Sequence, residues 1–326
     1  MASCNDNPHE IDVSSIELDL TLNRFEQDLF TCKSPQEIMA LKDKYPVFYN
    51  VYTRDIMPLI PEFRNPSEED RAVEFYKYIT NIDVDSLYKL ASRKFGDFED
   101  YRQDLNTLSK YIYHYFPEHK IDSLVTFVAT FKYGSIYIQD YDMFAVGLDM
   151  YMGRDFEVYP LLDPQYYPRY RIERFEEQYI VPNAAKSFLY YKLPRGDHET
   201  FIDEAVYEGK ILYCMDRLLP NTPDSLKIGY AKGMIEWSEA NEANIWGYLI
   251  ENELLFNTDK NDYITKFFND GPFTAPFGNE SPPKAGAWVG WQIVRAYMEK
   301  FPEKSLLELL GNKDHQAIFK ESGYKP

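Results

Sequence analysis

Two glutamates on one predicted helix are the first candidates for chemistry. Glu204 and Glu208 are four residues apart, so a helix over 199–219 places both carboxylates on one side. Paired carboxylates can serve as general acid and base when their surroundings shift their pKa values apart. A cation from another helix could instead hold them in a structural ion pair, and Arg295 is the cation we expect there. We favour the structural interpretation over catalysis.

The histidines do not have the spacing of a zinc peptidase. Such a site needs His at positions i and i+4 of a helix, with Glu at i+1 to activate water. His198 and Glu199 begin this pattern, but the i+4 position is Ile202, and no other pair among the five histidines completes it. The sequence also contains no Gly-x-Ser-x-Gly and no glycine-rich phosphate loop. We therefore predict no catalytic residue, no metal ligand and no cofactor.

Aromatic residues close to a long loop form a second candidate group. Its members fall on two predicted helices and are Glu242, Trp246, Trp288 and Trp291. Core packing is the default for aromatic residues at helical spacing, but these side chains could also line a cleft. The proline-rich loop 270–283 has the length and composition of a lid or a binding edge. The candidate cleft thus comprises Glu204, Glu208, Glu242, Trp246, Trp288, Trp291 and Arg295.

The segments that must position these residues change in character along the chain. Alternating apolar and polar residues predict a strand over 16–22, after which 25–52 and 84–116 have helical patterns. Three runs rich in β-branched and aromatic residues then predict strands at 120–131, 135–139 and 143–150. We expect these three strands to form an antiparallel meander that the N-terminal strand extends.

Nearly every segment after residue 159 has a helical pattern. The predicted helices are about 169–180, 182–193, 199–219, 231–256, 260–269, 285–300, 303–310 and 313–320. Asp197 is a plausible N-cap of the central helix, 199–219. Gly286 and Gly290 would let another backbone approach closely. Strands early and helices late predict a mostly helical α+β protein with a small antiparallel sheet.

The domain organisation follows from the same pattern. Residues 1–12 read as a tether, and 13–326 as a single domain that is mixed over 13–158 and helical over 159–326. Apolar residues make up 44% of the chain and aromatic residues 17%, as expected for a folded protein. The net charge of −18 argues against nucleic acid, whose phosphates are bound by clusters of Lys and Arg.

Cys4 stands apart from the other two cysteines. Small residues, Ala2 and Ser3, precede it, and the polar run 5–10 follows it, as in a mature bacterial lipoprotein. No apolar run in the sequence reaches the roughly 18 residues that a transmembrane helix needs. We therefore expect any membrane attachment to occur through a lipid on Cys4.

Six segments in the second half of the chain stand out together: 173–183, 203–213, 239–246, 272–274, 280–283 and 286–298. They resemble the gliding-motility lipoprotein GldB family of the Bacteroidetes. Their order along the chain makes the resemblance more specific than any single motif. That family is distantly similar to zincin-type metallopeptidases, in which a helix with Glu followed by Gly carries the third metal ligand. Glu208-Gly209 matches that position, whereas the preceding helix, 182–192, contains no histidine.

The resemblance implies a zincin-like fold without peptidase activity. It implies a non-enzymatic, lipid-anchored protein of the cell envelope, in the outer membrane and facing the periplasm. Its partners would be envelope proteins of the gliding and secretion apparatus, and the folded domain would act as a binding module. Two alternatives remain open: an atypical hydrolase around Glu204, Glu208 and Glu242, and a peptide or glycan binder whose cleft is edged by 270–291.

Overall fold

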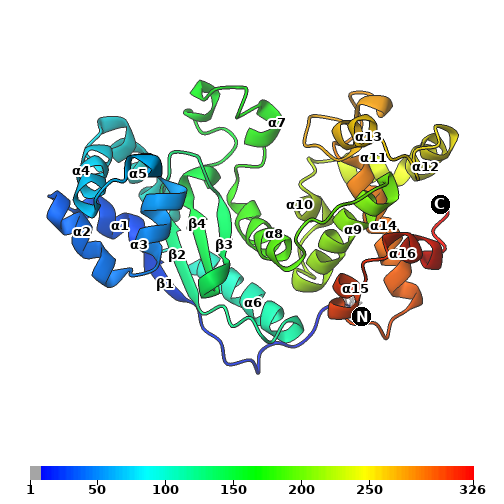
Figure 1. The fold of residues 1–326 in the computed structure, drawn as a ribbon, viewed down its shortest axis with the longest axis horizontal. Coiled ribbons are helices and arrows are strands. Elements are labelled where there is room, and N and C mark those ends of the chain that lie inside the picture. The colour runs from blue at the N-terminus through cyan, green and yellow to red at the C-terminus, as the bar shows by residue number, and fades with distance from the viewer. Residues whose placement is uncertain (1–8) are drawn as a thin grey trace, which may run out of the picture.

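A small mixed sheet lies between two groups of helices in the computed structural model, which describes residues 9–326 (Figure 1). Cys4 and most of the predicted tether lie outside the described residues. The strands are β1 Thr21–Arg24, β2 Ser123–Phe127, β3 Ser135–Ile138 and β4 Met143–Gly147. They are arranged in the order β1-β2-β4-β3. β1 with β2 and β2 with β4 are parallel pairs, and β3 with β4 is antiparallel.

The predicted antiparallel meander is therefore wrong. β2 does not turn back onto β3, because Thr130 and Phe131 both adopt left-handed backbone conformations, with φ of 49° and 66°. The carboxylate of buried Asp149 accepts hydrogen bonds from the backbone N–H groups of Ala129, at 3.1 Å, and Phe131, at 2.5 Å. After this bend the chain does not enter the sheet position next to β2. β4 occupies that position instead, and β3 becomes an edge strand.

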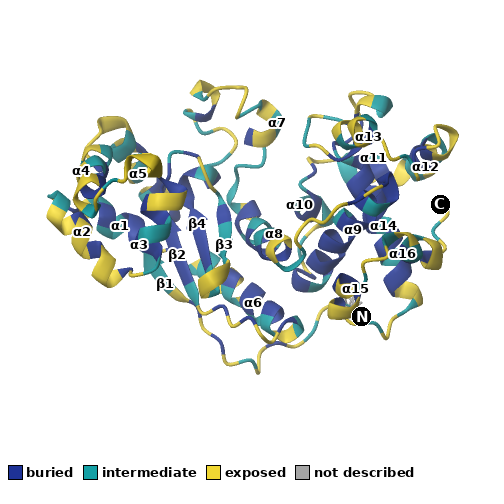
Figure 2. Ribbon diagram, in the orientation of Figure 1, coloured by how far each residue is buried: buried dark blue, intermediate teal, exposed yellow. Residues whose placement is uncertain are grey.

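Short helices cover one face of the sheet. They are α1 Phe25–Thr31, α2 Pro35–Lys44, α3 Phe48–Asn50, a π-helical turn Val51–Ile56 and α4 Glu68–Ile79; α5 Ile82–Phe95 and α6 Glu99–Tyr115 follow. Ser34 caps α2 by accepting a hydrogen bond from the backbone N–H of Glu37. Most residues of the two central strands, β2 and β4, are buried, as expected for a sheet covered on both sides (Figure 2). Val125 and Phe127 face this first group of helices, and Leu124 faces the larger core on the other side.

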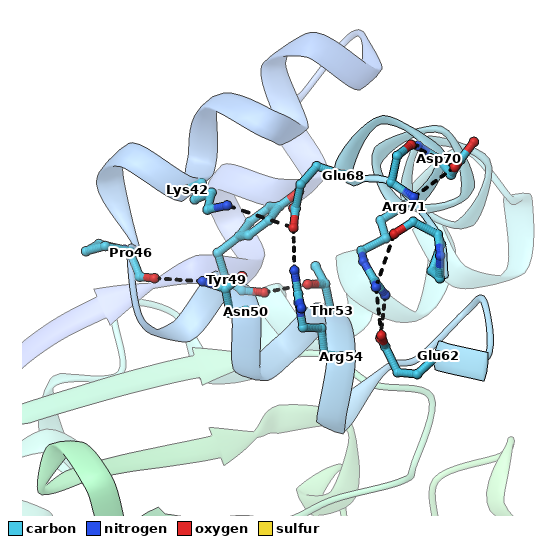
Figure 3. Close-up of polar contacts among 12 residues, drawn as sticks. Lys42, Pro46, Tyr49, Asn50, Thr53, Arg54, Glu62, Glu68, Asp70 and Arg71 are labelled. Atoms are coloured by element: carbon cyan, nitrogen blue, oxygen red, sulfur yellow. Dashed lines mark hydrogen bonds and ion pairs between the residues drawn. The ribbon is translucent and has the colours of Figure 1, made fainter. Parts of the chain in front are cut away.

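Two arginines in this first group of helices form ion pairs with glutamates near the surface (Figure 3). Arg71 is 4% exposed and donates two hydrogen bonds, at 2.6 and 2.9 Å, to the carboxylate of Glu62, whose side chain is half exposed. Arg54 donates a 2.6 Å hydrogen bond to Glu68. Bidentate arginine–carboxylate pairs of this kind fix the geometry of both partners.

The rest of the molecule is helical, as predicted. Its helices are α7 Arg169–Ile172, α8 Ile180–Lys192, α9 Phe201–Leu218, α10 Asp224–Ile228, α11 Met234–Ala240, α12 Glu242–Glu251, α13 Lys260–Phe267, α14 Ala285–Lys300, α15 Leu306–Gly311 and α16 His315–Ser322. A mostly helical α+β fold is therefore confirmed. The predicted N-cap at Asp197 is wrong, because Thr200 caps α9. Its hydroxyl accepts from the Asp203 backbone N–H, and the Asp203 carboxylate accepts from the Thr200 N–H.

Helices α9 and α14 form the centre of the larger core, and their backbones touch. A methyl group added at Gly290 would lie 1.7 Å from the Ala205 carbonyl oxygen, and one added at Gly209 would lie 2.1 Å from the Gly290 oxygen. The predicted close approach at Gly290 is therefore confirmed. Side chains on nearly all sides of α9 are buried, which explains why its polar residues need partners inside the protein.

Candidate functional site

Glu204 lies in a buried ion pair near the start of α9. Arg195 donates a hydrogen bond to Glu204 Oε1, and His198 Nδ1 lies 2.8 Å from Oε2. Burial by itself raises the pKa of Glu204, but the hydrogen bonds from His198 and Arg195 outweigh it and leave this pKa below its usual value. Arg195 and His198 both come from the segment just before α9. Glu204 is thus held as an ionised anchor for that segment.

Glu208 has a different environment, although it is only one helical turn away. Within residues 9–326 it makes no hydrogen bond and no ion pair within 4.0 Å. Burial raises its pKa, and the positive charge of Lys186 on α8 acts in the opposite direction. The two predicted glutamates therefore do not share a partner, and they do not form a matched acid–base pair with each other.

The predicted role of Arg295 as the partner of these glutamates is wrong. Its Nε and Nη2 atoms each lie 2.8 Å from an oxygen of Asp216, and Nη2 also lies 2.8 Å from Asp224. Asp216 additionally accepts hydrogen bonds from Lys227 Nζ and Trp291 Nε1, both at 2.9 Å. Arg295 sits one turn beyond the Gly209–Gly290 crossing, where the nearest acid on α9 is Asp216. We call Asp216, Asp224, Lys227, Trp291 and Arg295 the Asp216 network.

The remaining members of the predicted cleft lie elsewhere. Glu242 accepts a 2.7 Å hydrogen bond from Tyr324 near the C-terminus, and the ring of Trp246 packs edge-on against the same tyrosine. Trp288 is 3% exposed and belongs to the core of α14. The structure therefore distributes the seven predicted residues over the start of α9, the Asp216 network, the C-terminal segment and the core.

The predicted lid, loop 270–283, is held in place from within. Thr274 and Ser281 are fully buried, and the Thr274 N–H donates to Ser281 Oγ at 3.1 Å. The Thr274 hydroxyl donates to the carbonyl oxygen of Pro282 at 2.7 Å. At its first residue the loop places the partly buried Asp270 beside Arg171 of α7 and Arg174, where it contributes to a group of charges that the sequence did not indicate.

A cavity of about 350 Å³ lies between α8, the end of β3 and the segment around α7. Three cationic side chains line it, Arg171, Arg174 and Lys186, together with uncharged polar and aromatic groups that include Asn183, Ser187, Tyr179 and Tyr190. Arg174 also lines a neighbouring cavity of about 720 Å³ that reaches α10 and Asp270. Both volumes are in the range of small-molecule sites. Concavity and unmatched charge together make this the strongest candidate site.

Asp270 is the acidic centre of this region. Arg174 donates to Asp270 Oδ2, Arg171 Nε lies 3.6 Å from the same oxygen, and Lys284 Nζ lies 3.8 Å from Oδ1. Burial would raise the pKa of Asp270, but Lys284 and Arg174 more than offset that effect and lower it. The single carboxylate of Asp270 thus forms ion pairs with three cations.

Sequence reasoning missed Asp216, Asp270, Arg174 and Lys186. A signal for Lys186 was present, because it is a single cation in the apolar stretch 184–189, the same criterion that selected Arg295 on α14. No comparable local signal marks Asp216 or Asp270. Their importance depends on which helices pack against them.

Residues 9–326 contain neither a membrane-spanning helix nor a cluster of metal-binding side chains. Across residues 9–326, no helix is both long and apolar enough to cross a bilayer. In the same part of the chain, no three or more His, Cys, Asp or Glu side chains are grouped so that they could hold a metal ion.

Comparison with known proteins gives one match. No curated protein and no solved structure matches the chain. The family model described as gliding motility protein GldB matches residues 6–326, which is nearly the whole chain and includes both the sheet and the α8–α9 region. The chain therefore belongs to the GldB family, and this membership supports a lipoprotein associated with gliding motility.

Proposed function

We propose that this protein is a non-enzymatic binding module of the cell envelope, anchored to the outer membrane by a lipid on Cys4 and facing the periplasm. Its partners would be components of the gliding and secretion machinery. The observation that carries the binding role is the cavity beside α8, whose lining contains three cations and belongs to a chain with a net charge of −18. A cavity that gathers positive charges in a negatively charged protein is suited to binding a ligand or partner group of negative charge.

The donor set on α8 supports a non-enzymatic role. In the zincin-like arrangement that the family resemblance implies, α8 would correspond to the metal-binding helix and Glu208 on α9 to the third ligand. Asn183 and Ser187 occupy positions four residues apart on α8, where such a site needs two imidazoles. Asn183 Nδ2 donates to the Tyr151 hydroxyl at 3.0 Å, and the Ser187 hydroxyl donates to the Ala184 carbonyl at 2.8 Å. These residues do not fit a zinc ion.

Site-directed photo-crosslinking in the native host tests the proposed partner. Tyr190 lines the cavity and is 43% exposed, so a photoreactive residue placed there would contact anything that covers the site. Phe63 provides the matched control, because it is 85% exposed and belongs to the first group of helices. We expect a crosslink to a gliding or secretion component from position 190 alone. Equal crosslinking from both positions, or none from 190, would contradict the proposal.

Acylation of Cys4 has a separate test. Replacing Cys4 with Ala should move the protein from the membrane fraction to the soluble periplasmic fraction, because a lipid chain is then missing. Retention of the variant in the outer-membrane fraction at the wild-type level would show that another feature anchors the protein.

A second candidate function is an atypical hydrolase that uses Glu208. The observation in its favour is that burial raises the pKa of Glu208 while burial and the nearby Lys284 lower the pKa of Lys186 to about 7. Groups whose pKa values are shifted by burial in this way are candidates for general acid–base catalysis. Turnover of a peptide or ester library that disappears in Glu208→Gln, with the variant still folded by circular dichroism, would establish this function in place of the first.

A further inference from the structure

The cations around the cavity beside α8 outnumber the carboxylates that could neutralise them. Arg171, Arg174 and Lys186 line the cavity, and Lys284 lies 3.8 Å from Asp270 beside it. The carboxylates that act on these cations are Asp270 and Glu208. Asp270 already contacts three of these cations. Burial of an unpaired charge is unfavourable. An anion bound in the cavity would therefore be stabilised by the excess of cations, and it would neutralise them.

Lys186 is the cation with the weakest internal neutralisation. It lines the cavity, and none of the residues in 9–326 forms a hydrogen bond or an ion pair with it. Glu208 acts on it only from beyond 4.0 Å. The ammonium group therefore keeps its three hydrogen-bond donors free for a group that enters the cavity.

The position of Lys284 adds a second feature that does not serve helix stability. Lys284 occupies the N-cap of α14 with a left-handed backbone, at φ 56° and ψ 39°, and the first turn of α14 contains no acidic residue. A cation at the positive end of a helix dipole and a left-handed non-glycine residue are both unfavourable locally. The Lys284 ammonium lies 3.8 Å from Asp270, and its charge also lowers the pKa of Lys186 in the cavity lining.

Gly229 gives Arg174 the room to lie between the two cavities. Its φ of 84° is in the left-handed region, and a methyl group there would lie 3.2 Å from Arg174 Nη1 and 3.4 Å from Arg174 Cδ. The guanidinium group is therefore placed by the backbone of the segment after α10 as well as by Asp270. Planar guanidinium groups held in this way recognise carboxylate and phosphate groups through paired N–H donors.

We propose that this cavity binds a compact organic anion, a ligand with a carboxylate or phosphate group that Arg171, Arg174 and Lys186 hold. The proposal defines the ligand chemistry of the binding module proposed above, and it rests on that function only for the biological role of the site. Tyr179, Tyr190 and Phe175 in the lining would contact the uncharged body of the ligand.

The protonation of Lys186 is consistent with such a ligand. Burial and Lys284 lower the pKa of Lys186 to about 7, with Arg174 acting in the same direction and Glu208 and Asp270 in the opposite one. A bound anion stabilises the charged ammonium, so affinity is greater when Lys186 is protonated. Binding should therefore be tighter below pH 7 than above it, provided that the anion itself keeps its charge.

Calorimetric titration of the purified chain with inorganic phosphate and with succinate, at constant ionic strength in chloride, tests the proposal. We expect saturable binding of at least one of them, and the preferred probe identifies the head group. Lys186→Met and Arg171→Gln should each weaken that binding by about tenfold, as the loss of one charge-assisted hydrogen bond predicts. The Arg171 side chain is 47% exposed, so its replacement leaves the fold intact.

Lys89→Met is the matched control, because Lys89 pairs with Asp85 on the exposed surface of α5, away from the cavity. It should bind the probe like the wild type. Absence of saturable binding for both probes would overturn the anion site, as would wild-type affinity in both cavity variants. Either result would leave the partner test at position 190 unaffected, so the two proposals can fail independently.

Discussion

The Asp216 network and the cavity beside α8 show two ways of burying charge in one core. In the network, two carboxylates face two cations, and Asp216 alone accepts four hydrogen bonds. At the cavity, three cations line the wall and Lys284 lies beside Asp270, while Asp270 and Glu208 are the carboxylates that act on them. Lys186 makes no direct ion pair in the described part of the chain. The first arrangement is complete by itself, whereas the second is complete only with an added anion. The Asp216 network, in which each cation has a carboxylate partner, is thus a structural cluster, whereas the cavity, in which Lys186 has no direct partner in the described residues, is a candidate binding site.

The Glu62–Arg71 and Glu68–Arg54 pairs in Figure 3 also join each arginine to a carboxylate, but they lie nearer the surface. Each arginine meets a carboxylate at 2.6 Å, while Arg71 Nε and Glu68 Oε2 are buried without a hydrogen-bond partner in the described part of the chain. The Glu62 side chain is 52% exposed and that of Glu68 31%, so these pairs contribute less to stability than the network does. We therefore expect the cost of removing one charged partner to depend on how deeply the remaining partner is buried, in the Asp216 network, in these surface pairs and at the cavity.

Replacing Asp216 with Ala should produce the largest effect. The change leaves Lys227, 5% exposed, and Arg295 without their shared carboxylate inside the core. Loss of one partner from a buried charge cluster costs about 3–5 kcal/mol. The free energy of unfolding from urea titration measures it. Asp224→Ala is the control and should cost less, since the Asp224 side chain is 34% exposed; equal losses would contradict the difference in burial.

Replacing Gly290 with Ala should separate the helices that carry the network. The new methyl group would lie 1.7 Å from the Ala205 carbonyl oxygen, which is backbone and cannot rotate away. Overpacking of this kind costs roughly 2–3 kcal/mol. Thermal unfolding measures the loss. Gly247→Ala on α12 is the control, because no atom lies within 4 Å of its added methyl group, and it should be neutral or slightly stabilising.

Replacing Arg71 with Met should have a smaller effect, about 1 kcal/mol. The variant loses the bidentate pair with Glu62, but this glutamate is 52% exposed and becomes hydrated. The apolar methionine side chain retains much of the packing of the arginine stem. Urea titration beside Asp216→Ala gives the comparison. A loss as large as that of Asp216→Ala would show that burial of the partner does not set the scale.

Replacing Lys186 with Met should have the smallest effect on stability and the opposite sign, a gain of about 1 kcal/mol or less at neutral pH, because an unpaired charge is removed. The folded-state pKa of Lys186 lies at about 7, below the value of 10.5 for a free side chain. The unfolded state then binds more protons between these pH values, so wild-type stability rises with pH across this window. The variant should lack this contribution. Parallel slopes for both proteins in thermal melts across the window would count against an unpaired Lys186.

Local patterns predicted the helical half of the molecule well. Apolar periodicity located the segments of α8, α9, α13, α14 and α16 because each helix buries one or more faces against the core. Capping chemistry is local, because the cap depends on residues three apart, as Ser34 and Glu37 at the start of α2 show. The same reasoning chose Asp197 for α9, where Thr200 and Asp203 form the cap instead. Asp197 and Thr200, three residues apart, offer similar local signals, and the helix begins at the buried Phe201, directly after Thr200.

Strand pairing could not be predicted in the same way. The runs that contain β2, β3 and β4 were recognisable, but their order depends on Asp149, which binds the left-handed turn at Thr130 and Phe131 from eighteen to twenty residues away. A meander needs only neighbouring strands, whereas the observed parallel pair of β2 and β4 depends on that distant carboxylate. Contacts far apart in sequence carry no local pattern.

The amino-acid sequence by itself determined the class of this protein, the positions of most helices, the close approach at Gly290 and the family. These properties follow from periodicity, from residue size and from motifs whose members are near one another in the chain. Only the tertiary structure decided which charges meet. It paired Arg295 with Asp216 and left Lys186 facing a cavity, because electrostatic interaction depends on distance and burial in space.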